Sequence, residues 1–197
     1  MSNMVEIRWH GRGGQGAKTA SLLLADAAFA QGKYVQGFPE YGPERMGAPI
    51  AAYNRISDER SSVHSNIYEP DFVVVVDATL LSAVAATAGL KETGGLVVNS
   101  EKSPEELAKY YAADLGGYKG KIYSIDASQI AGEELGNRSL SNTAMLAAIV
   151  KVSGVIPEDS FMKEMEASIK DTFSSKPHVI APNMKAIERG LKEVKGL

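Results

Sequence analysis

The chain has 197 residues, 44% of them hydrophobic, and a formal net charge of −3 at pH 7. This length supports one substantial hydrophobic core, so we expect a single domain over residues 1–197. The acidic balance argues against a general nucleic-acid binder, and no apolar run approaches the roughly 20 residues of a membrane-spanning helix. Arg8, His10 and Arg12 stand where a signal peptide would be apolar. We therefore expect a cytoplasmic protein that binds neither nucleic acid nor membrane.

The chain contains no cysteine. This excludes disulfides, thiolate catalysis and cysteine-ligated iron–sulfur clusters together. The three histidines, His10, His64 and His178, lack the spacing of a zinc site. We expect no metal site, and any redox chemistry associated with this chain must be carried by another component.

The first elements are a short strand, a glycine-rich turn and a helix over residues 17–31. Gly11, Gly13 and Gly16 satisfy G-x-G-x-x-G in the strand–turn–helix context that gives this pattern meaning. Backbone amides at such a helix N-terminus form a seat for phosphate. The alternative is a tight turn that binds nothing. His10 has no positioned nucleophile beside it, which favours a structural or ligand contact over acid–base catalysis. The candidate phosphate site comprises His10, Gly11, Arg12, Gly13, Gly14, Gln15 and Gly16.

A second strand over residues 34–38 completes a β–α–β unit. The loop over residues 40–49 contains two glycines, two prolines and three charged residues. This composition predicts a structured loop, which we place on the same sheet edge as the glycine turn. Residues 50–56 and 60–65 read as a β-hairpin that adds an antiparallel piece to a parallel sheet.

The β-branched run over residues 72–76 predicts a central strand buried on both faces. Further strands are expected over residues 96–99 and 121–126. Asp77, Asn99 and Asp126 follow or end these strands, and they gather at the sheet edge where open α/β sheets bind ligands.

Helical signals dominate the rest of the chain. Ser103 begins a capping box with proline at the first helical position. Asn142 is expected to cap a helix over residues 143–152, Pro157 to start another, and the last helix to begin near Pro182. The predicted fold is α/β, with a mostly parallel Rossmann-like sheet, an inserted β-hairpin and a helical C-terminal part.

Four charged residues near the predicted site, Glu40, Arg12, Arg45 and Asp77, each allow more than one interpretation. Glu40 lies at a passable distance to hold the ribose of a dinucleotide, but a rigid loop follows it instead of a helix, which weakens an NAD interpretation. Arg12 and Arg45 can clamp a polyphosphate, or can form surface ion pairs such as Arg45 with Glu44. Asp77 is interpreted as a helix cap or an organiser of the loop, with a ligand contact as the alternative. No residues amount to an active site, so we assign no catalytic residue.

Three stretches of the sequence resemble a known family. Residues 8–16, 38–49 and 142–146 are similar to the gamma subunits of 2-oxoacid:ferredoxin oxidoreductases, most closely those of the pyruvate type. The resemblance implies a subunit of an enzyme that oxidatively decarboxylates pyruvate, with 2-oxoisovalerate or 2-oxoglutarate as alternative substrates. A stand-alone NAD- or FAD-binding oxidoreductase is the rival interpretation.

The resemblance also implies how the cofactors are divided. Alpha, beta and delta subunits would carry thiamine diphosphate, magnesium and iron–sulfur clusters, and electrons would pass to ferredoxin. The gamma part would serve assembly and the coenzyme A side, with the phosphates of coenzyme A at the glycine turn. The absence of cysteine and of a thiamine-type G-D-G motif agrees with this division. From the second loop, the resemblance adds Glu40, Tyr41, Glu44 and Arg45 to the candidate site.

Overall fold

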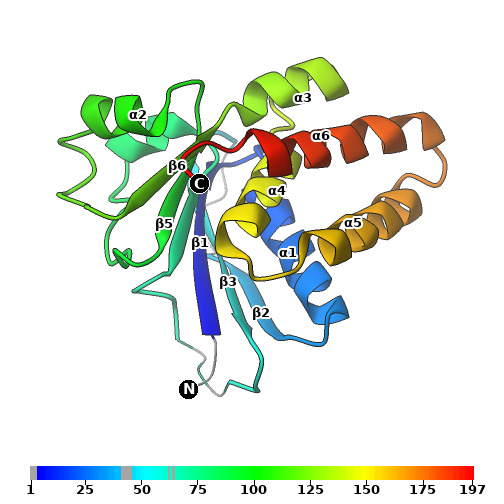
Figure 1. Ribbon diagram of the computed structural model, residues 1–197, viewed down its shortest axis with the longest axis horizontal. Helices are drawn as coiled ribbons and strands as arrows, with labels where there is room; N and C mark the ends of the chain where they lie inside the picture. Colours follow the sequence, from blue (N-terminus) through cyan, green and yellow to red (C-terminus); the bar gives the residue numbers. More distant parts are fainter. Residues whose placement is uncertain (1–3, 41–45, 62, 64) are drawn as a thin grey trace.

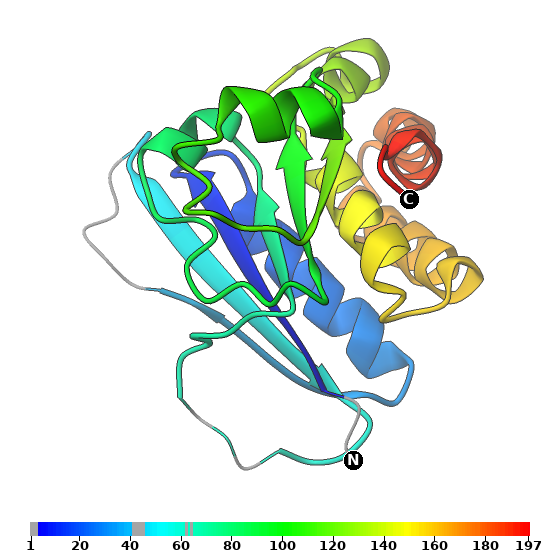
Figure 2. The ribbon, with the colours of Figure 1, turned by 60° about the vertical axis from the view of Figure 1, so that its left-hand side comes forward.

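The computed structural model describes residues 4–40, 46–61, 63 and 65–197. Its centre is a six-stranded sheet of order β2-β3-β1-β4-β5-β6, with helices on both faces (Figures 1 and 2). The strands are β1 (Met4–Arg12), β2 (Tyr34–Pro39), β3 (Pro49–Ser57), β4 (Phe72–Val75), β5 (Gly95–Asn99) and β6 (Lys121–Ile125). The helices are α1 (Ala17–Ala30), α2 (Pro104–Tyr110), α3 (Ala127–Leu135), α4 (Asn142–Ser153), α5 (Glu158–Thr172) and α6 (Ile180–Glu193), with 3-10 turns η1 (Ala78–Ser82) and η2 (Pro177–Val179). The predicted α/β fold class is confirmed.

Strand β1 lies inside the sheet and divides its side chains between the two faces. Ile7 and Trp9 are fully buried in the core that α1 and α4 cover. Because side chains alternate along a strand, Arg8, His10 and Arg12 lie on the opposite face. The apolar side chains of this strand therefore lie on one face of the sheet, and Arg8, His10 and Arg12 lie on the other.

The pairing of β2 and β3 upholds the predicted β–α–β crossover but corrects the predicted hairpin. The chain does cross from β1 through α1 to β2, but antiparallel β3 lies between β1 and β2. The inserted hairpin consists of β2 and β3. The described residues of the segment 60–65 (60, 61, 63 and 65) lie in no strand, so the prediction that this segment supplies the second strand of the hairpin is wrong. Arg55 holds that segment by side-chain bonds, donating to the carbonyl oxygens of Val63 (3.1 Å) and Ser65 (3.1 Å).

The helix boundaries follow the sequence signals closely. Helix α1 ends one residue before the expected position, and Gly32 follows it with φ of +77°. The capping box at Ser103 is present in full. Helix α4 begins at Asn142 itself, with Ser141 in the cap position. The last helix begins earlier than expected, at Ile180.

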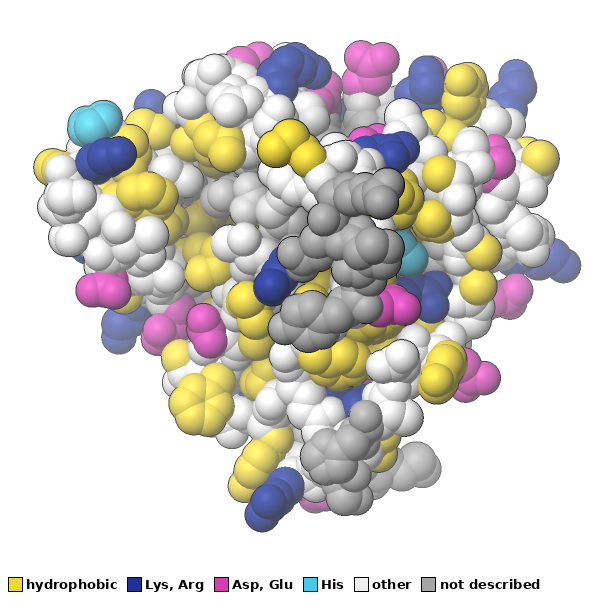
Figure 3. Space-filling view, turned by 180° about the vertical axis from the view of Figure 1, so that it is seen from behind, with side chains coloured by type: hydrophobic (Ala, Val, Ile, Leu, Met, Phe, Trp, Pro, Cys, Tyr) yellow, Lys and Arg dark blue, Asp and Glu magenta, His cyan; other side chains and the backbone are white. Residues whose placement is uncertain are grey.

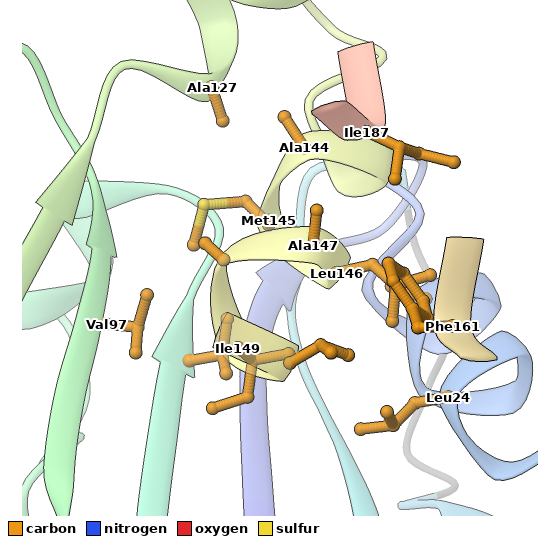
Figure 4. Packing of buried hydrophobic residues seen from close by; sticks show 14 of the residues in the cluster. Leu24, Val97, Ala127, Ala144, Met145, Leu146, Ala147, Ile149, Phe161 and Ile187 are labelled. Atoms are coloured by element: carbon orange, nitrogen blue, oxygen red, sulfur yellow. The ribbon is translucent and has the colours of Figure 1, made fainter. Parts of the chain in front are cut away.

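Helix α4 is the centre of the larger core. Every residue from Ala144 to Val150 is buried. Figure 4 shows this helix between Val97 of β5 on one side and Leu24 and Phe161 of α1 and α5 on the other. Gly190 of α6 packs directly on α4, since a Cβ atom at Gly190 would lie 2.6 Å from the Ala144 carbonyl oxygen.

This contact predicts an unusual effect of replacing a helical glycine. Gly→Ala inside a helix normally stabilises a protein by about 1 kcal/mol. We expect Gly190→Ala instead to lower the free energy of unfolding by about 1–3 kcal/mol, because the added methyl group overpacks the α4–α6 contact. Urea denaturation of the purified chain measures the change.

The matched control is Gly132→Ala in α3. A Cβ atom there meets only the flexible Arg138 side chain, at 3.0 Å. This variant should be neutral or more stable. Equal effects of the two substitutions would contradict the proposed close packing of α6 on α4.

Candidate functional site

The glycine turn and the second loop are joined by backbone hydrogen bonds. The Gly13 amide donates to the Ala48 carbonyl oxygen (2.9 Å), and the Gly47 amide donates to the Gly13 carbonyl oxygen (3.1 Å). The prediction that both loops share one edge of the sheet is therefore confirmed for the described residues.

Two glycines permit close packing at the start of α1. Gly16 is the N-cap of α1 with φ of +75°, and a Cβ atom there would lie 2.8 Å from Cγ of Asn142. A Cβ atom at Gly11 would lie 2.8 Å from Cβ of Ala17. No side chain caps the N-terminus of α1. Its first amides are consequently suited to an external acceptor such as phosphate.

A cavity of about 490 Å³ lies over this N-terminus. Its lining comes from the glycine turn, the first turn of α1 and the second loop, and comprises Gly13, Gly14, Gly16, Lys18, Thr19, Met46 and Ile50. Lys18 and Thr19 are absent from the site predicted from the sequence. A cationic residue in the first helical turn after G-x-G-x-x-G nevertheless indicates an anion site.

Arg12 points into a network instead of into this cavity. Its Nε donates to Oδ2 of Asp77 (3.0 Å), and its terminal nitrogens donate to Thr79 Oγ1 (2.9 Å) and to the Gly47 carbonyl oxygen (3.2 Å). Gln15 Nε2 donates to the same Asp77 oxygen (2.9 Å). Arg12 was expected either to clamp a polyphosphate or to form an ion pair, and the structure shows the ion pair with Asp77. Through this pair and the bond to Gly47, Arg12 ties both loops to the end of β4.

Asp77 is the acceptor at the centre of that network. It also caps η1 by accepting from the Thr79 amide (3.0 Å). Burial raises the pKa of Asp77, but hydrogen bonds from Thr79, Gln15 and Arg12 outweigh burial and leave the pKa below its ordinary value. The reading of Asp77 as a cap is confirmed.

The other polar residues at the strand ends also serve the fold. Asn99 donates to the Val76 carbonyl oxygen (2.9 Å) and to Ser128 Oγ (2.9 Å). Asp126 caps α3 by accepting from the Gln129 amide (2.8 Å). The predicted polar edge exists, but its side chains bond to nearby backbone groups and side chains of the fold.

His10 lies on the face of the sheet opposite α1, away from the cavity lining. Burial, together with the charge of Arg8, lowers the pKa of His10 to about 4. The imidazole is therefore neutral at pH 7, and its Nε2 atom is buried without a hydrogen-bond partner.

Glu40 follows the edge strand β2. It accepts a hydrogen bond from the Tyr53 hydroxyl (2.8 Å). Because β3 separates β2 from β1, Glu40 does not occupy the neighbouring strand end where a dinucleotide site places its ribose-binding acid. Tyr41, Glu44 and Arg45 lie outside the described residues, as does His64, and their roles stay predictions.

A second, larger cavity adjoins the first. Its volume is about 620 Å³, and mostly apolar side chains of α1, α4, α5 and α6 line it, among them Leu23, Met165, Ile169 and Phe173. Thr19 lines both cavities, and Asn142 joins this one to the glycine turn through its contact with Gly16. No pattern in the sequence beyond apolar helical periodicity indicates this cavity.

Within the described part of the chain, no group of three or more histidine and carboxylate side chains is placed to hold a metal ion. No helix among the described residues is long and apolar enough to cross a membrane.

The described residues place a glycine turn and an uncapped helix N-terminus at the edge of a mostly parallel α/β sheet. The family model described as pyruvate ferredoxin/flavodoxin oxidoreductase matches residues 6–193. The chain belongs to this family.

Relatives agree with this membership. The chain is 49% identical over 190 residues to pyruvate synthase subunit PorC of Thermotoga maritima, covering 96% of this chain and 94% of that one. It is 50% identical over 171 residues to the pyruvate/ketoisovalerate oxidoreductases common subunit gamma of Pyrococcus abyssi, covering 87% and 88%. The crystal structure of the Thermotoga maritima pyruvate oxidoreductase subunit PORC superposes with a TM-score of 0.83 at 46% identity, over 98% of this chain and 97% of that chain. The chain is thus a subunit of an oxidoreductase.

The packing of Gly16 predicts a specific coupling between two residues. Gly14→Ala should cost about 1–2 kcal/mol of stability, since φ is +94° and no atom lies within 4 Å of the added methyl. Gly16→Ala should cost more, because its methyl also meets Asn142. Replacing Asn142 by alanine should reduce this difference in a double-mutant cycle of unfolding free energies, because it removes Cγ and Nδ2 at 2.8 Å but keeps Cβ at 3.1 Å. An undiminished difference would contradict the contact.

His10 predicts a pH dependence of stability. Its pKa is about 4 in the fold against 6.5 in the unfolded chain, so only the unfolded chain binds the proton between these values. The free energy of unfolding therefore falls as the pH drops from 6.5 to about 4. His10→Gln should flatten this slope in urea denaturation across that window, whereas His178→Gln, at an exposed position, should not. An unchanged slope in His10→Gln would refute the burial effect.

Proposed function

We propose that the chain is the gamma subunit of a pyruvate:ferredoxin oxidoreductase and holds coenzyme A at the N-terminus of α1. The enzyme would oxidise pyruvate to acetyl-CoA and pass electrons to ferredoxin. Iron–sulfur clusters would reside on a partner subunit, since this chain has no cysteine to bind them. By family resemblance, alpha, beta and delta subunits would carry these clusters, thiamine diphosphate and magnesium. A cytoplasmic location is part of the same proposal.

The observation that carries the coenzyme A assignment is the cavity over the uncapped N-terminus of α1. Coenzyme A carries a pyrophosphate and a ribose phosphate, which suit helix-terminal amides and the Lys18 ammonium. The volume of about 490 Å³ lies in the range of ordinary ligand sites. The Arg12–Asp77 network supports this seat by fixing the two loops that line it.

The choice of 2-oxoacid would lie with partner subunits. The Pyrococcus abyssi relative is named as a gamma subunit common to pyruvate and ketoisovalerate oxidoreductases. A subunit shared by two enzymes does not select between their substrates. We therefore assign pyruvate by similarity to the relatives and place no substrate-selecting residue in this chain.

The test is steady-state kinetics of the assembled enzyme carrying Lys18→Met. Loss of one charge-assisted phosphate contact corresponds to about 1.5–3 kcal/mol, so the apparent KM for coenzyme A should rise about tenfold or more. The KM for pyruvate should stay unchanged, because pyruvate would react on the partner subunits.

Lys163→Met is the matched control, since it removes the same charge from an exposed position on α5. It should leave both constants unchanged. An unaltered KM for coenzyme A in Lys18→Met would sink the assignment of this cavity.

A further inference from the structure

The two edges of the sheet are finished differently. At one edge, β6 bonds to the C-terminal segment: the Ser124 amide donates to the Lys195 carbonyl oxygen (3.2 Å), and the Lys195 amide donates to the Ser124 carbonyl oxygen (2.8 Å). At the other edge, β2 pairs with β3 alone among the described strands (Figures 1 and 2). No residue of β2 is charged. Proteins usually protect such an edge with charged side chains, because unpaired backbone groups attract a further strand.

The pairing register shows which backbone groups of β2 face the open edge. The Glu40 amide donates to the Ala51 carbonyl oxygen (3.0 Å), so the even-numbered residues of β2 form the hydrogen-bonded pairs with β3. The N–H and C=O groups of Val35 and Gly37 therefore point away from β3. Among the described residues, nothing accepts from these two amides. Two free donors and two free acceptors thus stand at this edge.

The free donors end on both sides of this pair. The Lys33 amide already donates to a carbonyl oxygen of α1 (3.2 Å), and Pro39 has no N–H. A strand that adds to β2 can therefore accept only from residues 35 and 37. An antiparallel copy of β2 centred on Gln36 uses both donors: Val35 exchanges two hydrogen bonds with the second copy's Gly37, and symmetry repeats the exchange in the reverse direction.

The side chains opposite α1 suit the same register. Tyr34, which is 50% exposed, would lie opposite the second copy's Phe38, whose side chain is only partly buried. Aromatic pairs across antiparallel strands are stabilising. Gln36 would lie at the two-fold axis, where a charged residue would meet its own copy and be repelled. Figure 3, which views the molecule from behind, shows hydrophobic side chains at the surface of this face.

On the face covered by α1, exposed apolar side chains lie along the same edge. Leu22, 41% exposed, is beside Gly37, because a Cβ atom at Gly37 would lie 4.0 Å from its Cδ2. Phe29, 72% exposed, follows Leu22 by two helical turns on the same side of α1. Since α1 contacts β1 and β3 as well as β2, its axis lies inward of the edge. Joining two copies through β2 would place their α1 helices about 10 Å apart, an ordinary packing distance.

We propose that β2 pairs antiparallel with β2 of a second copy of this chain, so that one continuous sheet crosses a two-fold axis at Gln36. Each copy supplies the donors and acceptors that the other lacks, and the pairing covers apolar side chains on both faces of the edge. The inference goes beyond the coenzyme A proposal and uses none of the residues that line that cavity.

A cysteine at the axis tests the register. The chain contains no cysteine, so Gln36→Cys introduces its only thiol. In the proposed pairing the two Cα atoms at position 36 lie about 4.5 Å apart, within the range of a disulfide. Mild oxidation of the purified chain at micromolar concentration should convert most of it to a disulfide-linked dimer on a non-reducing gel.

Tyr34→Cys is the matched control on the same face of β2. Its two copies would lie four residues apart along the paired strands, about 13 Å, which is too far for a disulfide. This variant should stay largely unlinked, although position 34 is exposed. Absence of the dimer in Gln36→Cys, or equal linking in both variants, would overturn the proposed pairing.

The aromatic contacts provide a second measurement, without a covalent link. Tyr34→Ala removes two cross-strand aromatic pairs from the dimer, so sedimentation equilibrium should show its dissociation constant rising about tenfold. Tyr110→Ala is the control, since Tyr110 is 68% exposed but lies on α2. It should leave the dissociation constant unchanged. Equal constants for the two variants would contradict the pairing of Tyr34 with the second copy's Phe38.

A strand of another subunit is the competing occupant of this edge. In the assembled oxidoreductase, the Gln36→Cys variant should again link two copies of this chain, as identified by mass spectrometry of the linked peptide. A link to a different subunit, or loss of the link on assembly, would show that β2 is not paired with its own copy and would overturn the proposal.

Discussion

The alternation of side chains along β1 is the constraint on which the rest of this structure depends. One face of the strand presents Ile7 and Trp9 to the helical layer, and Trp9 donates to Asn54, which in turn donates to the Ser21 carbonyl oxygen of α1. A shift of one residue in register would place Arg8 and His10 in the helical core. The hydrogen-bonded Trp9–Asn54 pair fixes the register of β1, and with it which side chains of β1 face away from the helical layer.

At the edge of the sheet, the polar side chains of the candidate site are engaged with one another. Arg12, Gln15 and Asp77 bind one another, so they are unavailable for chemistry, but they hold two loops at a fixed separation. Rigid loops reduce the entropy that binding a flexible ligand would otherwise cost. Such an arrangement agrees with the proposal that this subunit holds coenzyme A for chemistry on its partners.

Sequence patterns predicted the fold class and nearly all helices, because capping residues and apolar periodicity are local signals. The predicted pairing of β3 with residues 60–65 is wrong, because Val63 and Ser65 contact the side chain of Arg55 instead, and no local sequence pattern reports such a contact. For the site, G-x-G-x-x-G located the helix N-terminus, and Arg12 was recognised as either a clamp or an ion-pair partner. Its actual partner, Asp77, lies 65 residues away in the chain, and only the sheet brings the two together.

Helix α4 has a consequence for reading the family signature. Residues 142–146 carry part of the resemblance, yet only Asn142 and Thr143 line a cavity, and the following residues are core. That part of the signature records packing more than ligand recognition. Because residues 144–150 of this helix are buried, we expect their amide hydrogens to exchange only through the largest openings of the fold. The exchange rate of α4 therefore reports the stability of the whole fold, whichever ligand or partner is bound elsewhere.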